Sequence, residues 1–138
     1  MIIENMKKEY IIENESYYSC QYLIVFCTKY QRKFLSPEIK TFLQNLFYET
    51  ADKFDFKIYS LEILENQVSL IIDCNPKFGI DKAVTKLKNN SSSALKKHYP
   101  YLEKKVPSIW TRKSFISTMG NADTEDVNRF ILNQKRSQ

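Results

Sequence analysis

Few side chains in this sequence could act as a nucleophile or bind a transition metal. The 138 residues include three cysteines, Cys20, Cys27 and Cys74, and one histidine, His98. The cysteines are odd in number and form no C-x-x-C pair, so their spacing lacks the pattern of a zinc site. We therefore expect free, mostly buried thiols in a reducing cytoplasm and no bound metal. His98 ends a basic stretch and is expected to complement a helix dipole.

The sequence also lacks the loops that bind common cofactors. Its two glycines, Gly79 and Gly120, are far apart. This excludes the glycine-rich turns that hold dinucleotides or nucleotide phosphates. The carboxylates form no D-x-D pair of the kind that holds Mg²⁺. We expect no cofactor and no small-molecule substrate.

Cations, by contrast, are clustered and interleaved with aromatic rings. The net charge is +5, and Glu103 is the one acid among the basic residues that follow Lys82, up to residue 113. Clustered lysine and arginine commonly bind phosphate, although a solvated helix surface would have the same composition. Trp110 is expected to lie in the core or in a dimer interface. The residues expected to contact nucleic acid are Lys29, Tyr30, Arg32, Lys33, Lys82, Lys86, Lys88, Asn89, Ser92, Arg112 and Lys113.

The first residues differ in charge from the rest. Four acids, Glu4, Glu9, Glu13 and Glu15, fall within the first fifteen positions. We predict an acidic arm over residues 1–16 and one domain over residues 17–138. The opening residues carry no signal-peptide stretch, and the apolar run at 22–27 is too short to cross a bilayer. A cytoplasmic protein without membrane contact is expected.

Hydrophobic periodicity and capping residues predict the elements that must position these side chains. Residues 17–27 are rich in aromatic and β-branched side chains and predict a strand. Ser36 and Pro37 begin an amphipathic helix that reaches about residue 54. Two strands at 57–64 and 68–73 form a hairpin, and Asp81 is expected to cap a helix ending at His98. An irregular link between Pro100 and Pro107, a strand at 115–118 and a last helix capped by Asp123 complete the chain.

This order, β-α-β-β-α-β-α, predicts an α+β fold with a ferredoxin-like antiparallel sheet, as in RNA-recognition domains. Its helices cover one face, and a further helix is added at the C-terminus.

Several segments of the sequence resemble one family. Residues 18–33 (YSCQYLIVFCTKYQRK) are similar to the opening strand and basic turn of the single-strand DNA transposases of the insertion-sequence 200/605 type and of their palindrome-associated tyrosine relatives. The similarity continues through residues 86–92, Trp110, residues 115–120 and residues 130–134, in the family's order. It covers residues 17–134, nearly the whole chain.

The resemblance implies that the cleavage site is degenerate. The family cleaves DNA with a metal-binding His-apolar-His motif on a strand and a tyrosine on the last helix. Gln67-Val68-Ser69 falls on the histidine motif, and Phe130 falls on the tyrosine; Gln134 retains the polar ligand one turn later. Phenylalanine has no attacking oxygen, and glutamine and serine are weak ligands for a transition metal. The resemblance therefore implies an inactive homologue, not an enzyme.

What remains favours binding. The family is dimeric, and the run LIVFC, which is apolar on both faces, suits a strand buried on both sides. We expect a homodimer that binds DNA or RNA stem-loops, as a regulator. Two alternatives stay open: a module that forms mixed dimers with an intact transposase, and a decaying product of a mobile element. Tyr99 or Tyr101 could in principle serve as a substitute nucleophile.

Overall fold

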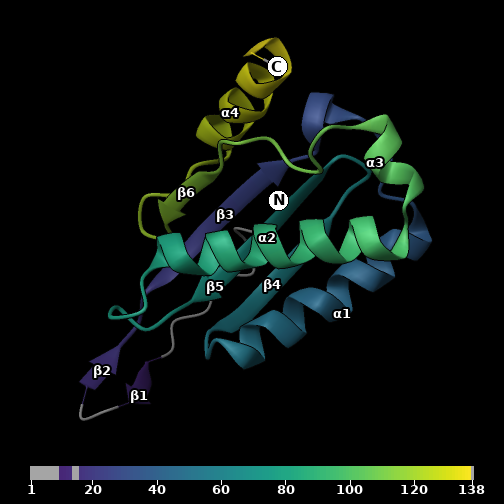
Figure 1. Ribbon diagram of the computed structural model, residues 1–138. Coiled ribbons are helices and arrows are strands. Elements are labelled where there is room, and N and C mark those ends of the chain that lie inside the picture. The colour runs from purple at the N-terminus through teal and green to yellow at the C-terminus, as the bar shows by residue number, and fades with distance from the viewer. Residues whose placement is uncertain (1–9, 14–15, 138) are drawn as a thin grey trace.

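The computed structural model describes residues 10–13 and 16–137 of the chain. Its centre is a four-stranded antiparallel sheet in the order β4-β5-β3-β6 (Figure 1). This is the strand order of two interleaved β-α-β units, and it confirms the predicted ferredoxin-like fold. The elements of the main sheet and its helices are β3 (Gln21–Cys27), α1 (Pro37–Lys53), β4 (Lys57–Ile63), β5 (Gln67–Asp73), α2 (Ile80–His98), α3 (Tyr101–Lys105), β6 (Phe115–Thr118) and α4 (Thr124–Ser137).

The first predicted strand is divided in two. Residues 17–27 contain β2 (Ser16–Tyr18) and β3, with a break at Ser19 and Cys20. β2 pairs with β1 (Ile11–Glu13) as a separate two-stranded hairpin at one end of the main sheet (Figure 1). The predicted boundary between an arm and a domain falls inside β2, while residues 1–9 of that arm lie outside the described residues.

The helix starts follow from their capping residues, with one exception. The Ser36 hydroxyl accepts a hydrogen bond from Ile39 N at 3.4 Å, and Pro37 occupies the first turn, so α1 begins as predicted. Asp123 Oδ1 accepts from Glu125 N at 2.8 Å at the start of α4. The prediction that Asp81 caps α2 is wrong. Gly79, with φ of +89°, is the cap residue, and Asp81 lies in the first turn, where its charge complements the helix dipole.

Both faces of the sheet are covered within the chain. Helices α1 and α2 pack on one face, against side chains such as Phe26 and Leu70, while α4 packs on the other, against Leu23 and Val25 (Figure 1). Strand β3 is therefore buried on both sides by its own chain, and its apolar sequence does not by itself require a second copy.

The link between Pro100 and Pro107, predicted to be irregular, contains the short helix α3. No helix in the described part of the chain is both long and apolar enough to cross a membrane.

Candidate nucleic-acid interface

The turn after β3 has an unusual backbone. Two consecutive residues of this short helical turn η2 (Lys29–Gln31), Tyr30 and Gln31, have φ of +59° and +51°. Residues other than glycine rarely adopt this left-handed backbone conformation, and such strain is often found at functional sites. The turn is held at its base, because Thr28 Oγ1 donates to Arg32 O at 2.8 Å and Lys29 N donates to Ile109 O at 2.9 Å.

This turn presents an aromatic ring together with cations. The Tyr30 side chain is 48% exposed. The Lys29 Nζ and Arg32 Cζ atoms lie 5.3 and 5.7 Å from its ring centroid, and Lys33 is exposed beside them. A ring so placed can stack on an unpaired base while its neighbours contact phosphates. The structure thus brings together the predicted residues of this segment, which we call the Tyr30 turn (residues 29–33).

A side-chain hydrogen bond fastens the Tyr30 turn to the last helix. Gln31 Nε2 donates to Ile131 O of α4 at 2.9 Å. The neighbouring Phe130 packs on the sheet with its ring centroid 5.8 Å from that of Phe115. Sequence reasoning missed Gln31 and Thr28, because neither is charged. Gln31 acts through Ile131, which is distant in sequence, and the Thr28 hydroxyl lies against both Arg32 O and the distant Asn66 O, at 3.2 Å from the latter.

The four positions that the resemblance matches to the cleavage site, Gln67, Ser69, Phe130 and Gln134, lie on the same side of the sheet as α4. Alternate residues of a strand share a face, so Gln67 and Ser69 face the same way as Ile71, which packs in the cluster under α4. Ser69 is 2% exposed. Gln134, one turn after Phe130, is also buried. The structure therefore brings the four positions to one face of the sheet.

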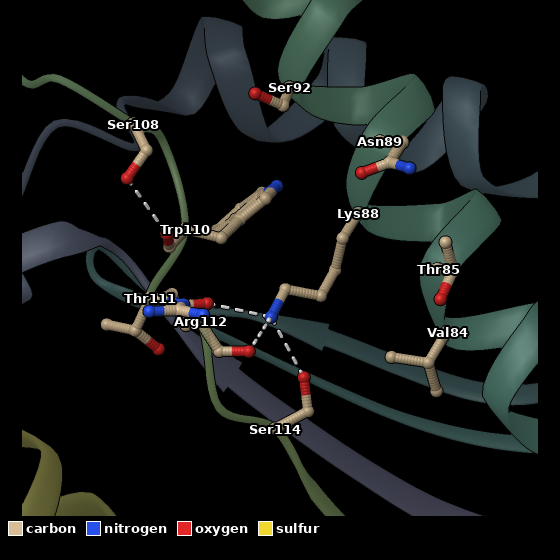
Figure 2. Close-up of a pocket in the computed structure, with 10 residues that line it drawn as sticks. All are labelled: Val84, Thr85, Lys88, Asn89, Ser92, Ser108, Trp110, Thr111, Arg112 and Ser114. Carbon is tan, nitrogen blue, oxygen red and sulfur yellow. Dashed lines mark hydrogen bonds between the residues drawn. The ribbon is translucent and has the colours of Figure 1, made fainter.

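The predicted lysines of α2 do not form a single surface. Lys82 Nζ lies 6.0 Å from the ring centroid of Phe78, and Lys86 Nζ lies 4.9 Å from that of Phe54. Lys88 extends in another direction, toward residues 111–114 (Figure 2). A helix turns by about 100° per residue, so positions 86 and 88 are on opposite sides. The three lysines, all expected to contact nucleic acid, therefore do not share one side of α2.

The side chain of Lys88 links α2 to residues 111–114 by hydrogen bonds. Its Nζ donates to Thr111 O at 2.7 Å, to Arg112 O at 3.3 Å and to Ser114 Oγ at 3.0 Å (Figure 2). An ammonium group has three donors, and all are used here. Burial lowers the pKa of Lys88 to about 8. Contrary to the prediction, this arrangement leaves Lys88 no donor for a direct phosphate contact.

Other predicted residues meet around a groove beside Lys88. Asn89 and Ser92 of α2 and Arg112 of the opposite segment line a cavity of about 400 Å³ (Figure 2). Lys113 is exposed next to it but is not among the lining residues. Sequence reasoning missed the hydroxyl groups that also line it, although the segment before β6 is rich in serine and threonine. These hydroxyl groups belong to Thr85, Ser108, Thr111 and Ser114.

Trp110 forms the inner wall of this groove and is part of the core, as predicted. Its Nε1 donates to Ser91 Oγ at 2.9 Å, and its ring meets that of Phe26 edge to face with centroids 4.8 Å apart. Trp110 also pairs with Thr28 in an isolated β-bridge, just before the Tyr30 turn. Backbone pairing between residues 28 and 110 therefore joins the groove to the Tyr30 turn.

The architecture makes this protein a ferredoxin-like α+β domain with an added helix that meets a basic turn. Residues 16–134 match the family model described as "Transposase IS200 like", and the chain belongs to this family. The resemblance read from the sequence is thereby confirmed.

Individual relatives agree with this assignment. The ISDra2 transposase TnpA of Deinococcus radiodurans is 23% identical over 119 residues, which is 85% of each chain. A solved structure of a candidate transposase from Deinococcus radiodurans superposes with a TM-score of 0.80 and 23% identity, over 94% of this chain and 98% of that one. A REP-associated tyrosine transposase bound to a REP hairpin superposes with a TM-score of 0.55 and 11% identity, over 91% and 67% of the two chains.

Proposed function

We propose that this member of the family binds nucleic-acid stem-loops, acts as a regulator and has lost strand cleavage. The observation that carries the proposal is the hydrogen bond from Gln31 to Ile131. This bond joins the exposed, basic Tyr30 turn to α4. Helix α4 carries Phe130 at the position that the resemblance matches to the family's tyrosine. A phenyl ring has no oxygen to attack a phosphate, so the covalent phosphotyrosine step is missing.

The residues in place of the metal-binding histidines do not fit a transition metal. Gln67 offers a neutral amide oxygen, and Ser69 offers a hydroxyl at a position that is 2% exposed. Neither approaches imidazole as a ligand, and Gln134 alone does not make a site. Among the described residues, no group of three His, Cys, Asp or Glu side chains could hold a metal ion.

The binding half of the proposal rests on the Tyr30 turn. Its exposed ring and its cations match the two parts of a stem-loop, unpaired bases and a charged backbone. The relative bound to a REP hairpin supports a hairpin as the ligand of this chain. RNA is a second form of the same ligand, because an exposed aromatic ring beside cations can stack on unpaired bases of either nucleic acid.

Fluorescence anisotropy tests the proposal. Labelled stem-loops of one sequence, made as DNA and as RNA, are titrated with the protein over a salt series, with an unstructured strand as control. The Arg32→Ala/Lys33→Ala variant should lower the slope of log affinity against log salt by about one unit for each lost phosphate contact. A matched control is Lys104→Ala/Lys105→Ala on exposed α3, which should leave the slope unchanged. Absence of binding to either stem-loop at low salt would refute the function.

A second candidate function has one observation in its favour. The outer face of the β1–β2 hairpin exposes Tyr10, Ile12 and Tyr17, of which Ile12 and Tyr17 are directly paired across the strands. Exposed aromatic residues are common at protein interfaces. They support a module that forms mixed dimers with an intact transposase. Light scattering of the protein mixed with an active relative tests it: a mixed species that Tyr17→Ser abolishes would favour this function.

A further inference from the structure

The groove between α2 and residues 108–114 has a composition that favours an anion. Its polar lining consists of hydroxyl groups, the Asn89 amide, Arg112 and Lys88, and none of the described residues that line it is a carboxylate (Figure 2). The hydroxyls of Ser108 and Thr111 already donate to Trp110 O and Lys113 O, so an anion here would rely on the donors of Arg112, Asn89 and Ser92. The walls come from two segments that are distant in sequence, so this arrangement of donors is a product of the fold.

The ammonium of Lys88 adds a positive charge that forms no ion pair with a carboxylate among the described residues. Its three hydrogen bonds go to two carbonyl oxygens and one hydroxyl, all uncharged. Cys27 of β3 is the titratable group whose charge would raise the pKa of Lys88, but burial raises the pKa of that thiol to about 11, so it is neutral near pH 7. A half-buried cation without a counter-charge is unfavourable. An anion in the adjacent groove would relieve that cost.

We propose that this groove binds one phosphate group, with Arg112 as its cation and Asn89 and Ser92 as neutral donors. Lys88 supplies positive potential from beneath while it keeps the segment around Arg112 in place. A planar base is a poorer occupant, because Trp110 is 5% exposed and offers little ring surface for stacking. This inference rests on the proposed function, because the phosphate group would belong to the bound nucleic acid. The source of the phosphate is either the backbone or the 5′ end of that nucleic acid.

Inorganic phosphate is the first probe. Trp110 is the single tryptophan of the chain and lines the groove, so its indole N–H signal in nuclear magnetic resonance reports on occupancy. Phosphate at constant ionic strength, balanced with chloride, should shift this signal in a saturable way. A charged hydrogen bond contributes about 1.5–3 kcal/mol, so Arg112→Gln should weaken the apparent affinity about tenfold or more.

The matched control is Lys104→Gln on α3, which removes the same charge from an exposed residue that does not line the groove. It should change the phosphate affinity less than about twofold, as expected for a screened surface charge. Asn89→Ala provides a second variant on the opposite wall and should also weaken binding. An indole signal that does not respond to phosphate, or equal losses in Arg112→Gln and Lys104→Gln, would overturn the proposal.

Stem-loops of one sequence with a 5′-phosphate or a 5′-hydroxyl then separate the two sources. Tighter binding of the phosphorylated form, lost in Arg112→Gln, assigns the groove to a terminal phosphate. Equal binding of both forms, weakened equally by Arg112→Gln, assigns it to the backbone. If stem-loops bind but Arg112→Gln has no effect, the groove proposal fails while the proposed function stands. If phosphate binds but no stem-loop does, the function fails and the phosphate site stands.

Discussion

The ring of Phe130 packs against the ring of Phe115, with centroids 5.8 Å apart and planes inclined at 54°. This contact joins α4 to the edge strand β6 and is part of the apolar cluster that α4 forms with the sheet. The position that the resemblance matches to the family's tyrosine is here part of a hydrophobic contact, which supports the proposed loss of cleavage.

Restoring the hydroxyl alone should not restore cleavage. In Phe130→Tyr the ring keeps its place, but Gln67 and Ser69 still provide no imidazole ligands to polarise a scissile phosphate. We expect a folded protein with no nicking of a labelled stem-loop in Mg²⁺ or Mn²⁺, as judged by denaturing gel electrophoresis. Measurable nicking would contradict this account of the two ligand positions.

Replacing the ring of Tyr30 should separate binding from stability. Tyr30→Gly removes the side chain and accepts φ of +59° without strain, so the free energy of unfolding should be unchanged or slightly higher. Affinity for the stem-loop should fall about tenfold, because stacking on one base contributes about 1–3 kcal/mol. Tyr30→Phe keeps the ring and should bind as the wild type does. If Tyr30→Gly binds normally, the ring is not a stacking platform.

Removing the ammonium group of Lys88 should destabilise the segment that carries Arg112. Lys88→Met leaves two backbone carbonyls and the Ser114 hydroxyl without their donor, which should lower the free energy of unfolding by about 1–3 kcal/mol. Lys86→Met, on the other side of α2, is the control and should have a much smaller effect. Urea denaturation measures both. Equal effects in the two variants would show that the three hydrogen bonds contribute nothing specific.

The titration of Lys88 gives a pH dependence of definite sign. Its pKa is about 8 in the folded protein and 10.5 without the fold, so the unfolded chain binds more protons between these values. The free energy of unfolding of the wild type relative to Lys88→Met should therefore be constant below pH 7. It should rise by up to about 1 kcal/mol between pH 8 and 9. Paired denaturation curves over this interval check the prediction, and a fall would contradict it.

A substitution in a buried polar pair on β3 and β5 should raise the free energy of unfolding. Gln21 and Asp73 are directly opposite and are 8% and 1% exposed. Within the described part of the chain, neither amide atom of Gln21 nor Asp73 Oδ2 has a hydrogen-bond partner. Burial raises the pKa of Asp73, so its stabilising contribution is lost as the pH rises through that pKa. Asp73→Asn removes the charge and can donate to Gln21, and should raise the free energy of unfolding at pH 7 by about 1 kcal/mol.

The control for this pair is Asp52→Asn on the exposed side of α1, which should change stability by less than about 0.5 kcal/mol. The gain from Asp73→Asn should shrink as the pH falls and the wild-type carboxyl becomes protonated. A loss of stability in Asp73→Asn would mean that the attraction between Asp73 and Lys57 outweighs the cost of burial.

Local patterns determined most of the fold. The caps at Ser36 and Asp123 and the apolar spacing between them are properties of neighbouring residues, and α1, β4, β5, β6 and α4 lie where they were predicted. The errors also have local causes. Gly79 competes with Asp81 as the start of α2, and a short break at Ser19 and Cys20 divides what the composition indicates as one strand.

In the candidate site, too, some features follow from residue identity and others only from tertiary packing. The sequence by itself determined that position 130 has no hydroxyl, that positions 67 and 69 have no imidazole, and that cations surround Tyr30, because these are facts of residue identity. Only the tertiary structure decided which cations are free to act. Lys88 meets carbonyl groups more than twenty residues away, at Thr111 and Arg112. Such a partner is chosen by the packing of α2 against a distant segment, and no local pattern encodes it.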